Sequence, residues 1–120
     1  MTRQRNGSPP GTDPEVELPY AGIETFLKAD HRDVDELDEY DAGVVGVPYD
    51  GAVSNRPGAR YGPQAIRRAS SWWAYLSGYK GGLTNMRTEK QVDFSRLSVA
   101  DCGDVPVFPM DHRRTAESVK

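Results

Sequence analysis

Three aspartates have the type and position that a binding or catalytic site would use. Asp50, Asp101 and Asp104 each stand at or just after an apolar run that we expect to be a strand, and open α/β folds bind ligands at such strand ends. A pair of these carboxylates would suit a cation, or a guanidinium held by charge-assisted hydrogen bonds. The structural alternative is that each carboxylate accepts hydrogen bonds from amides of its own turn.

Two arginines lie close together in the polar segment that follows the first of these runs. Arg56 and Arg60 are separated by a Pro57-Gly58 pair that restricts the backbone. Guanidinium groups at a fixed spacing suit either recognition of a carboxylate or an internal ion pair that locks the loop. For Arg60 we favour the locking role.

The sequence contains no motif for nucleophilic catalysis, for a histidine metal site or for nucleotide binding. Cys102 has no histidine near it in sequence, and a Gly-x-Ser-x-Gly motif is absent. His31 and His112 fall in no metal-ligand pattern. The dinucleotide and phosphate-loop glycine motifs are also missing.

An acidic run over residues 33–41 raises the question of a metal site, because hard cations prefer oxygen ligands. The run lacks the ligand positions and central glycine of an EF-hand loop. We therefore interpret it as a solvated acidic linker, and a small metal-binding module remains the alternative.

A strand, a loop and a helix must position the central polar residues. The valine-rich segment 42–47 predicts a strand buried on both faces, as in a parallel sheet, and Pro48 ends it. Residues 49–61 form the loop. Gly62-Pro63 predicts a helix start, and the helix should run to Leu76 with Gly78 near its C-terminal cap.

The apolar residues of this helix predict its packing face. Ile66, Ala69, Trp73 and Leu76 share one side, which Trp72 extends. We interpret both tryptophans as core or subunit-interface residues, with ligand stacking as the alternative.

The remaining segments give the domain plan. Residues 1–19 are rich in proline and glycine and predict a flexible arm, or one that docks on a neighbouring subunit. Residues 20–41 combine a short helix, with apolar residues at Tyr20, Ile23, Phe26 and Leu27, and the acidic linker.

Residues 42–120 form the first portion of an α/β domain. Within it, 78–87 is a loop, the second strand leads through residues 101–105, and a helix capped by Asp111 starts near the end of the sequence, which indicates a domain incomplete at its C-terminus.

Composition limits the compartment and the partners. The net charge of -3 argues against a nucleic-acid surface. One cysteine fits a reducing compartment. No apolar run reaches the roughly 20 residues that span a bilayer, and the N-terminus lacks a secretory signal. We expect a soluble, cytoplasmic protein without membrane or nucleic-acid partners.

The run GVPYDGAVSNRPGARYGPQAIRRAS over residues 46–70 resembles the N-terminal signature of the ureohydrolase (arginase/agmatinase) family, most closely its agmatinase branch. That branch reads Gly-[Val/Ile]-Pro-[Phe/Tyr]-Asp, then Asn-Arg-Pro-Gly-Ala-Arg, then Gly-Pro and a helix. Residues 20–27 and the Asp101-Cys102-Gly103-Asp104-Val105 turn resemble flanking segments in the same order. The long central run is the specific part of the resemblance.

The resemblance implies the N-terminal part of a three-layer α/β/α parallel-sheet fold of the arginase type. It also implies hydrolysis of a guanidino compound to urea and an amine. The family uses two Mn²⁺ ions per site, or nickel in some relatives, to generate a hydroxide nucleophile. Full-length members are commonly homo-oligomers, trimers or hexamers. Agmatine, guanidinobutanoate, guanidinopropanoate and guanidine are all substrates within the branch.

One departure limits what can be carried over. The family's metal ligands lie in Gly-Gly-Asp-His, Asp-Ala-His-x-Asp and Asp-x-Asp segments, and none occurs in this sequence. We expect them after Lys120, so no catalytic or metal-binding residue is assigned, no metal should bind these 120 residues alone, and the chain alone should be inactive. Asp50, Asn55 and Arg60 are assigned to the rim of the substrate pocket. A non-catalytic accessory subunit derived from the same fold is the alternative.

Overall fold

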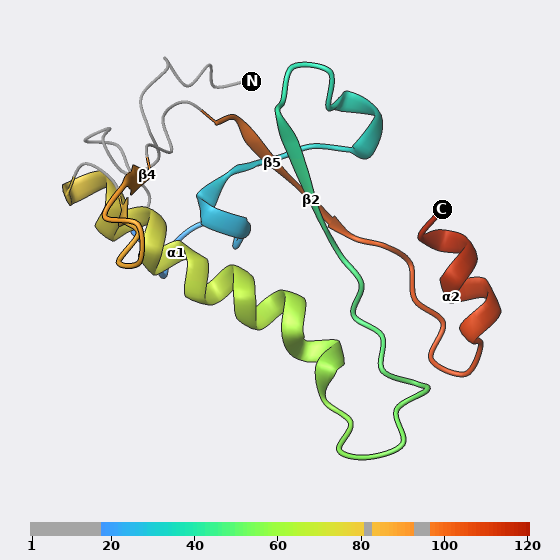
Figure 1. The fold of residues 1–120 in the computed structure, drawn as a ribbon. Coiled ribbons are helices and arrows are strands. Elements are labelled where there is room, and N and C mark those ends of the chain that lie inside the picture. The colour runs from blue at the N-terminus through green and yellow to red at the C-terminus, as the bar shows by residue number, and fades with distance from the viewer. Residues whose placement is uncertain (1–17, 81–82, 93–96) are drawn as a thin grey trace.

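The computed structural model of the chain describes residues 18–80, 83–92 and 97–120 (Figure 1). Almost all of the predicted N-terminal arm, residues 1–17, and residues 81–82 of the predicted loop lie outside these ranges. The described part combines a small parallel sheet, one long helix, one short helix and a separate hairpin.

The sheet has three parallel strands, which confirms the predicted α/β class. Its strands are β1 (Asp30–His31), β5 (Val99–Asp104) and β2 (Ala42–Gly46), in the order β1-β5-β2. The register shifts near the end of β2, where Val44 pairs with Asp101 but Gly46 pairs with Asp104. The extra residue lies in β5, where Gly103 takes a φ of 71° that favours glycine.

Strand β2 starts and ends close to its predicted bounds, but it is not buried on both faces. Val45 is 42% exposed, and only Gly46 of the five strand residues is buried. The prediction was wrong because burial on both faces needs packed layers above and below the strand, and the described residues leave Val45 and Val47 each 42% exposed.

The long helix α1 (Gly62–Lys80) begins at the predicted Gly62-Pro63 pair and follows a turn of 3-10 helix, Ala59–Tyr61. It does not stop near Leu76 but continues through Gly78. A glycine inside a helix costs only about 1 kcal/mol relative to alanine, so it need not end one.

The buried side of α1 is the opposite of the predicted one. Ser70, Ser71 and Ala74 are buried, whereas Trp72 and Trp73 are 51% and 54% exposed. Ile66, Ala69 and Leu76 are exposed as well. The apolar stripe is thus outside the core of the described residues, because polar contacts rather than apolar burial decide which face of α1 turns inward. The subunit-interface interpretation of the tryptophans stays a prediction.

The segment before β2 is less helical than its apolar spacing predicts. It contains two 3-10 turns, Phe26–Lys28 and Val34–Glu36, separated by β1. The predicted helix is interrupted because Leu27 and Lys28 have φ angles of 53° and 55°. Tyr20 and Ile23 are exposed, so no apolar stripe is buried here.

Besides β5, the C-terminal third contains an unpredicted hairpin and a predicted helix. A hairpin of β3 (Leu83–Thr84) and β4 (Gln91–Val92) lies in a region that includes the predicted loop. Helix α2 (His112–Ser118) confirms the predicted Asp111 cap, whose side chain accepts hydrogen bonds from the amides of Arg113 and Arg114. None of the helices in the described ranges is long and apolar enough to cross a membrane.

Candidate functional site

The loop between β2 and α1 extends away from the sheet and is closed by an ion pair (Figure 1). Asp50 Oδ1 lies 2.7 Å from Arg60 Nε and 2.6 Å from Arg60 Nη2. Asp50 Oδ2 accepts hydrogen bonds from the amides of Gly58, at 2.7 Å, and Arg60, at 3.3 Å. We call this arrangement the loop clasp, and it confirms the locking role predicted for Arg60.

The clasp combines a buried carboxylate with a partly exposed guanidinium. The Asp50 side chain has no exposed surface, whereas that of Arg60 is 48% exposed. Hydrogen bonds from the Arg60 guanidinium, helped by the two amides and opposed by burial, lower the pKa of Asp50 to about 2. The pKa of Arg60 is raised by the same hydrogen bond. Both groups therefore stay charged across the physiological pH range.

The clasp leaves the tip of the loop open to solvent. Residues 51–61 are exposed, and Arg56 takes a φ of 50° beside Pro57. The structure therefore brings Asp50 and Arg60 together and places Asn55 on the exposed tip between them. The role of these three residues at a pocket rim stays a prediction.

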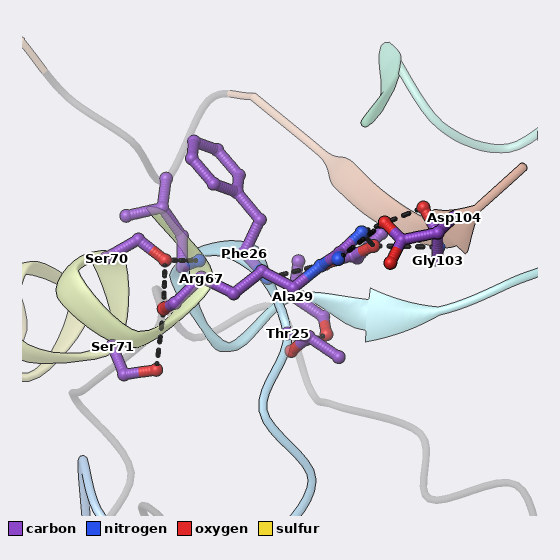
Figure 2. Close-up of polar contacts among 10 residues, drawn as sticks. Thr25, Phe26, Ala29, Arg67, Ser70, Ser71, Gly103 and Asp104 are labelled. Atoms are coloured by element: carbon purple, nitrogen blue, oxygen red, sulfur yellow. Dashed lines mark hydrogen bonds and ion pairs between the residues drawn. The ribbon is translucent and has the colours of Figure 1, made fainter. Parts of the chain in front are cut away.

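A second cluster of charged groups joins α1 to the end of β5, and Arg67 at its centre was not identified from the sequence (Figure 2). Arg67 Nε donates to Asp101 Oδ2 at 2.8 Å, and Arg67 Nη2 donates to Asp101 Oδ1 at 3.0 Å. Arg67 Nη2 also donates to the Gly103 carbonyl oxygen at 2.8 Å, and Nη1 donates to Asp104 Oδ1 at 2.7 Å. We call these residues the helix clamp.

The helix clamp is buried and tied to the backbone. The side chains of Arg67 and Asp101 are 12% and 1% exposed. Asp101 also accepts hydrogen bonds from the amides of Phe26 and Gly103, at 2.6 and 2.8 Å. Burial acts against ionisation of Asp101, but the hydrogen bonds from Arg67 and the two amides together outweigh it and lower its pKa. The hydrogen bond to Asp101 raises the pKa of Arg67, against the effect of burial.

Serine hydroxyls continue the clamp along α1. The Leu27 amide donates to Ser70 Oγ at 2.8 Å, and the Ser70 and Ser71 hydroxyls donate to the Arg67 carbonyl oxygen (Figure 2). The segment at Phe26–Lys28 is therefore held between α1 and β5 by hydrogen bonds. These contacts explain why the polar side of α1 faces inward.

For Asp101, both interpretations of the strand-end aspartates apply: it binds a guanidinium and also accepts a hydrogen bond within its own turn. Asp101 and Asp104 do bind a guanidinium, but it belongs to Arg67 of the same chain. The hydrogen bond from the Gly103 amide shows that Asp101 also stabilises its own turn. The one available signal was the polar stripe of Arg67, Ser70 and Ser71 at helical spacing.

The described residues do not fit a metal centre or a reactive thiol. Residues 18–80, 83–92 and 97–120 contain no group of three or more His, Cys, Asp or Glu side chains that could hold a metal ion, and this includes the acidic run at 33–41. The pKa of Cys102 is raised by burial and by the nearby Asp101 and Asp33 charges, which disfavours a thiolate. What this part of the chain offers is a loop closed by the loop clasp and a helix joined to β5 by the helix clamp, both at the carboxyl edge of a parallel sheet.

Comparison with known proteins identifies sequences that share these elements. Residues 40–120 match the Arginase family. The chain is 37% identical over 99 residues to proclavaminate amidinohydrolase from Streptomyces clavuligerus, which covers 82% of this chain and 28% of that protein. It is 34% identical over 98 residues to guanidinopropionase from Pseudomonas aeruginosa, covering 80% of this chain and 27% of that protein.

The fold is shared with solved structures as well. The crystal structure of a hypothetical agmatinase from Burkholderia thailandensis superposes with a TM-score of 0.67 and 31% sequence identity. The match covers 87% of this chain and 30% of that structure. The chain therefore spans less than a third of the length of the relatives that it matches.

Proposed function

The chain belongs to the arginase family, and on that premise we propose that it is the N-terminal part of an agmatinase-like ureohydrolase. The whole protein would hydrolyse a guanidino compound to urea and an amine. The observation that carries the proposal is the match of residues 40–120 to this family. These residues of the chain include both the loop clasp and the helix clamp. The relatives are named for amidino and guanidino substrates.

The part played by this chain follows from what its residues hold in place. The loop clasp ties together the two ends of the segment 50–60, which limits the shapes that its exposed tip can take before a ligand binds. A preformed loop at the carboxyl edge of the sheet suits a pocket rim, because it does not have to be ordered when substrate binds. We assign Asp50 and Arg60 to fixing the rim and Asn55 to its surface.

The metal centre of the family is proposed to lie outside these residues. Two Mn²⁺ ions, or nickel ions, would need several carboxylate and imidazole ligands, and the described residues do not bring three such groups together. Asp101 and Asp104 are already neutralised by Arg67. We therefore derive no metal-dependent step from this chain and place the ligands after Lys120.

The substrate is left open among guanidino compounds. The relatives carry names for different substrates although they are similar to this chain to nearly the same extent, 37% and 34%. Similarity over these residues therefore does not select agmatine, guanidinobutanoate, guanidinopropanoate or guanidine. The loops that choose between them are proposed to follow Lys120, together with the contacts that form a trimer or hexamer in the cytoplasm.

An accessory subunit remains the second candidate because of one observation. Trp72, Trp73 and Ile66 expose a continuous apolar side of α1, and a non-catalytic partner of a full-length relative would use such a surface. Two measurements separate the candidates. The nucleotide sequence after codon 120 should encode Gly-Gly-Asp-His and the later ligand segments if the chain is part of the enzyme. A stop codon instead favours the accessory subunit or a decayed gene. Urea release by the continued chain then tests the activity itself.

A further inference from the structure

The turn at the end of β5 surrounds a guanidinium group with acceptors on three sides. Both Asp101 oxygens face the Nε and Nη2 atoms of Arg67, the Gly103 carbonyl oxygen accepts from Nη2, and Asp104 Oδ1 accepts from Nη1. Four of the five N–H donors that a guanidinium carries are therefore engaged. Few arrangements recognise the planar shape of this cation so completely.

Two of the three acceptor groups, the Asp101 carboxylate and the Gly103 carbonyl, have contacts other than Arg67 that hold them in place. Asp101 is fixed by the amides of Phe26 and Gly103, and the turn is shaped by the left-handed backbone of Gly103. Removing the arginine side chain would leave the Asp101 carboxylate, which is 1% exposed in the native chain, without its countercharge and beside the space that the side chain had filled. Such a group strongly favours the binding of a matching cation, because a buried unpaired charge is costly. Asp104, at 38% exposure, gives the site contact with solvent.

We propose that the turn from Asp101 to Asp104 is a guanidinium-binding site, which the native chain fills with its own Arg67. A free alkylguanidinium ion should bind there when the Arg67 side chain is truncated. The alkyl group would take the space that the arginine stem leaves, and the planar head would restore the four hydrogen bonds. This inference depends on the helix clamp and is independent of the urea-releasing activity proposed above.

Thermal unfolding of the wild-type chain and of Arg67→Ala tests the site, with circular dichroism of the helices as the signal. Each protein is unfolded in sodium chloride and in ethylguanidinium chloride at the same ionic strength, about 50 mM. Guanidinium salts lower stability in proportion to concentration, so the wild-type midpoint should fall slightly. The midpoint of Arg67→Ala should rise instead. At five times the dissociation constant, the folded-to-unfolded ratio increases about sixfold.

Three controls make this opposite response specific. Tetramethylguanidinium lacks most of the N–H donors and should not raise the midpoint of Arg67→Ala. The variant Arg67→Lys fills the site with a tethered ammonium and should respond like the wild type. Adding Asp101→Asn to Arg67→Ala removes the carboxylate charge and should abolish the rise.

If Arg67→Ala does not fold in sodium chloride, its refolding yield is measured with and without ethylguanidinium, and an increase supports the site. The proposal is overturned if the variant and the wild type respond in the same direction. It is equally overturned if tetramethylguanidinium is as effective as ethylguanidinium, or if the refolding yield does not change.

Discussion

The Asp104 carboxylate occupies the space that a Cβ atom on Gly46 would take. The two residues are paired across β2 and β5, and the same added atom would lie 2.9 Å from Pro63 Cβ. Glycine at the end of β2 thus lets the carboxylate turn toward Arg67 while the start of α1 packs close by. One small residue allows strand, turn and helix to meet.

The variant Gly46→Ala should therefore be destabilised, by about 1–3 kcal/mol, as is typical when an extra methyl group is forced into filled space. The Asp104 side chain can move, but Pro63 is held at the first turn of the helix. Chemical denaturation with urea measures the loss as a lower midpoint.

Gly62→Ala is the matched control for this substitution. A Cβ atom there meets nothing within 4 Å, and Gly62 has helical angles, φ -58° and ψ -54°. Alanine should raise stability by about 0.4–1 kcal/mol because it restricts the unfolded chain. Equal effects of the two substitutions would contradict the close packing at Gly46.

Removing one partner of the helix clamp should cost far more than removing an exposed ion pair. We expect Arg67→Ala to lose about 3–5 kcal/mol, because it leaves the buried Asp101 charge without a partner. Glu24→Ala breaks only the exposed pair with Arg68, at 3.5 Å, and should change stability by less than about 1 kcal/mol.

A double-mutant cycle separates the interaction energy of the Arg67–Asp101 pair from the separate effects of the two substitutions. Asp101→Asn removes the charge and keeps an acceptor for only one of the two backbone amides, because Phe26 and Gly103 donate to different Asp101 oxygens. This cost is the same with or without Arg67, so the loss in Arg67→Ala/Asp101→Asn should still be smaller than the sum of the single losses. Strict additivity in urea unfolding would show that Arg67 and Asp101 do not act as a pair.

Acid should open the loop clasp only at very low pH. The pKa of Asp50 is about 2 in the folded chain against an ordinary value of 3.8, so the unfolded chain binds more protons between these values. The contribution of the clasp is therefore complete above about pH 4 and is lost as the pH falls toward 2. The ¹³C shift of the Asp50 carboxyl group, followed by NMR, should titrate with a midpoint near 2.

Arg60→Gln provides the comparison for this titration. The variant removes the first cause of the low pKa, so the Asp50 midpoint should move upward toward its ordinary value. A wild-type midpoint near 3.8, or one that Arg60→Gln leaves unchanged, would show that the clasp does not form in solution.

The fluorescence of Trp72 and Trp73 measures whether another surface covers the apolar face of α1. Both are more than half exposed, so their fluorescence in the 120-residue chain should be quenched readily by acrylamide. In the chain continued past Lys120 they should be protected, and an accessory subunit should instead become protected when a full-length relative is added. Protection in the 120-residue monomer alone would contradict the outward orientation of this face.

Contacts within one segment could be predicted from the sequence, and contacts between segments could not. The Asp111 cap and the locking role of Arg60 were predicted, although Asp50 was not named as the partner of Arg60, and both contacts join residues no more than ten positions apart. The Arg67–Asp101 pair spans 34 positions and depends on how α1 lies against β5. Nothing in the order of the residues shows that arrangement.

The prediction of which face of α1 is buried was wrong for a related physical reason. Apolar spacing identifies the side of a helix that avoids water, but here the side with Arg67, Ser70 and Ser71 has partners for its polar groups. Satisfied polar groups can be buried at little cost. The exposed tryptophans therefore mark a second surface of α1, which the sequence could not distinguish from the core side.

Urea release measures the central claim most directly. The 120-residue chain and the chain continued past Lys120 are each incubated with agmatine or 4-guanidinobutanoate, in Mn²⁺ and separately in Ni²⁺. We predict no urea from the 120 residues, because the described part brings no metal-binding group together, and metal-dependent urea release from the continued chain. Turnover by the 120-residue chain alone would contradict the account.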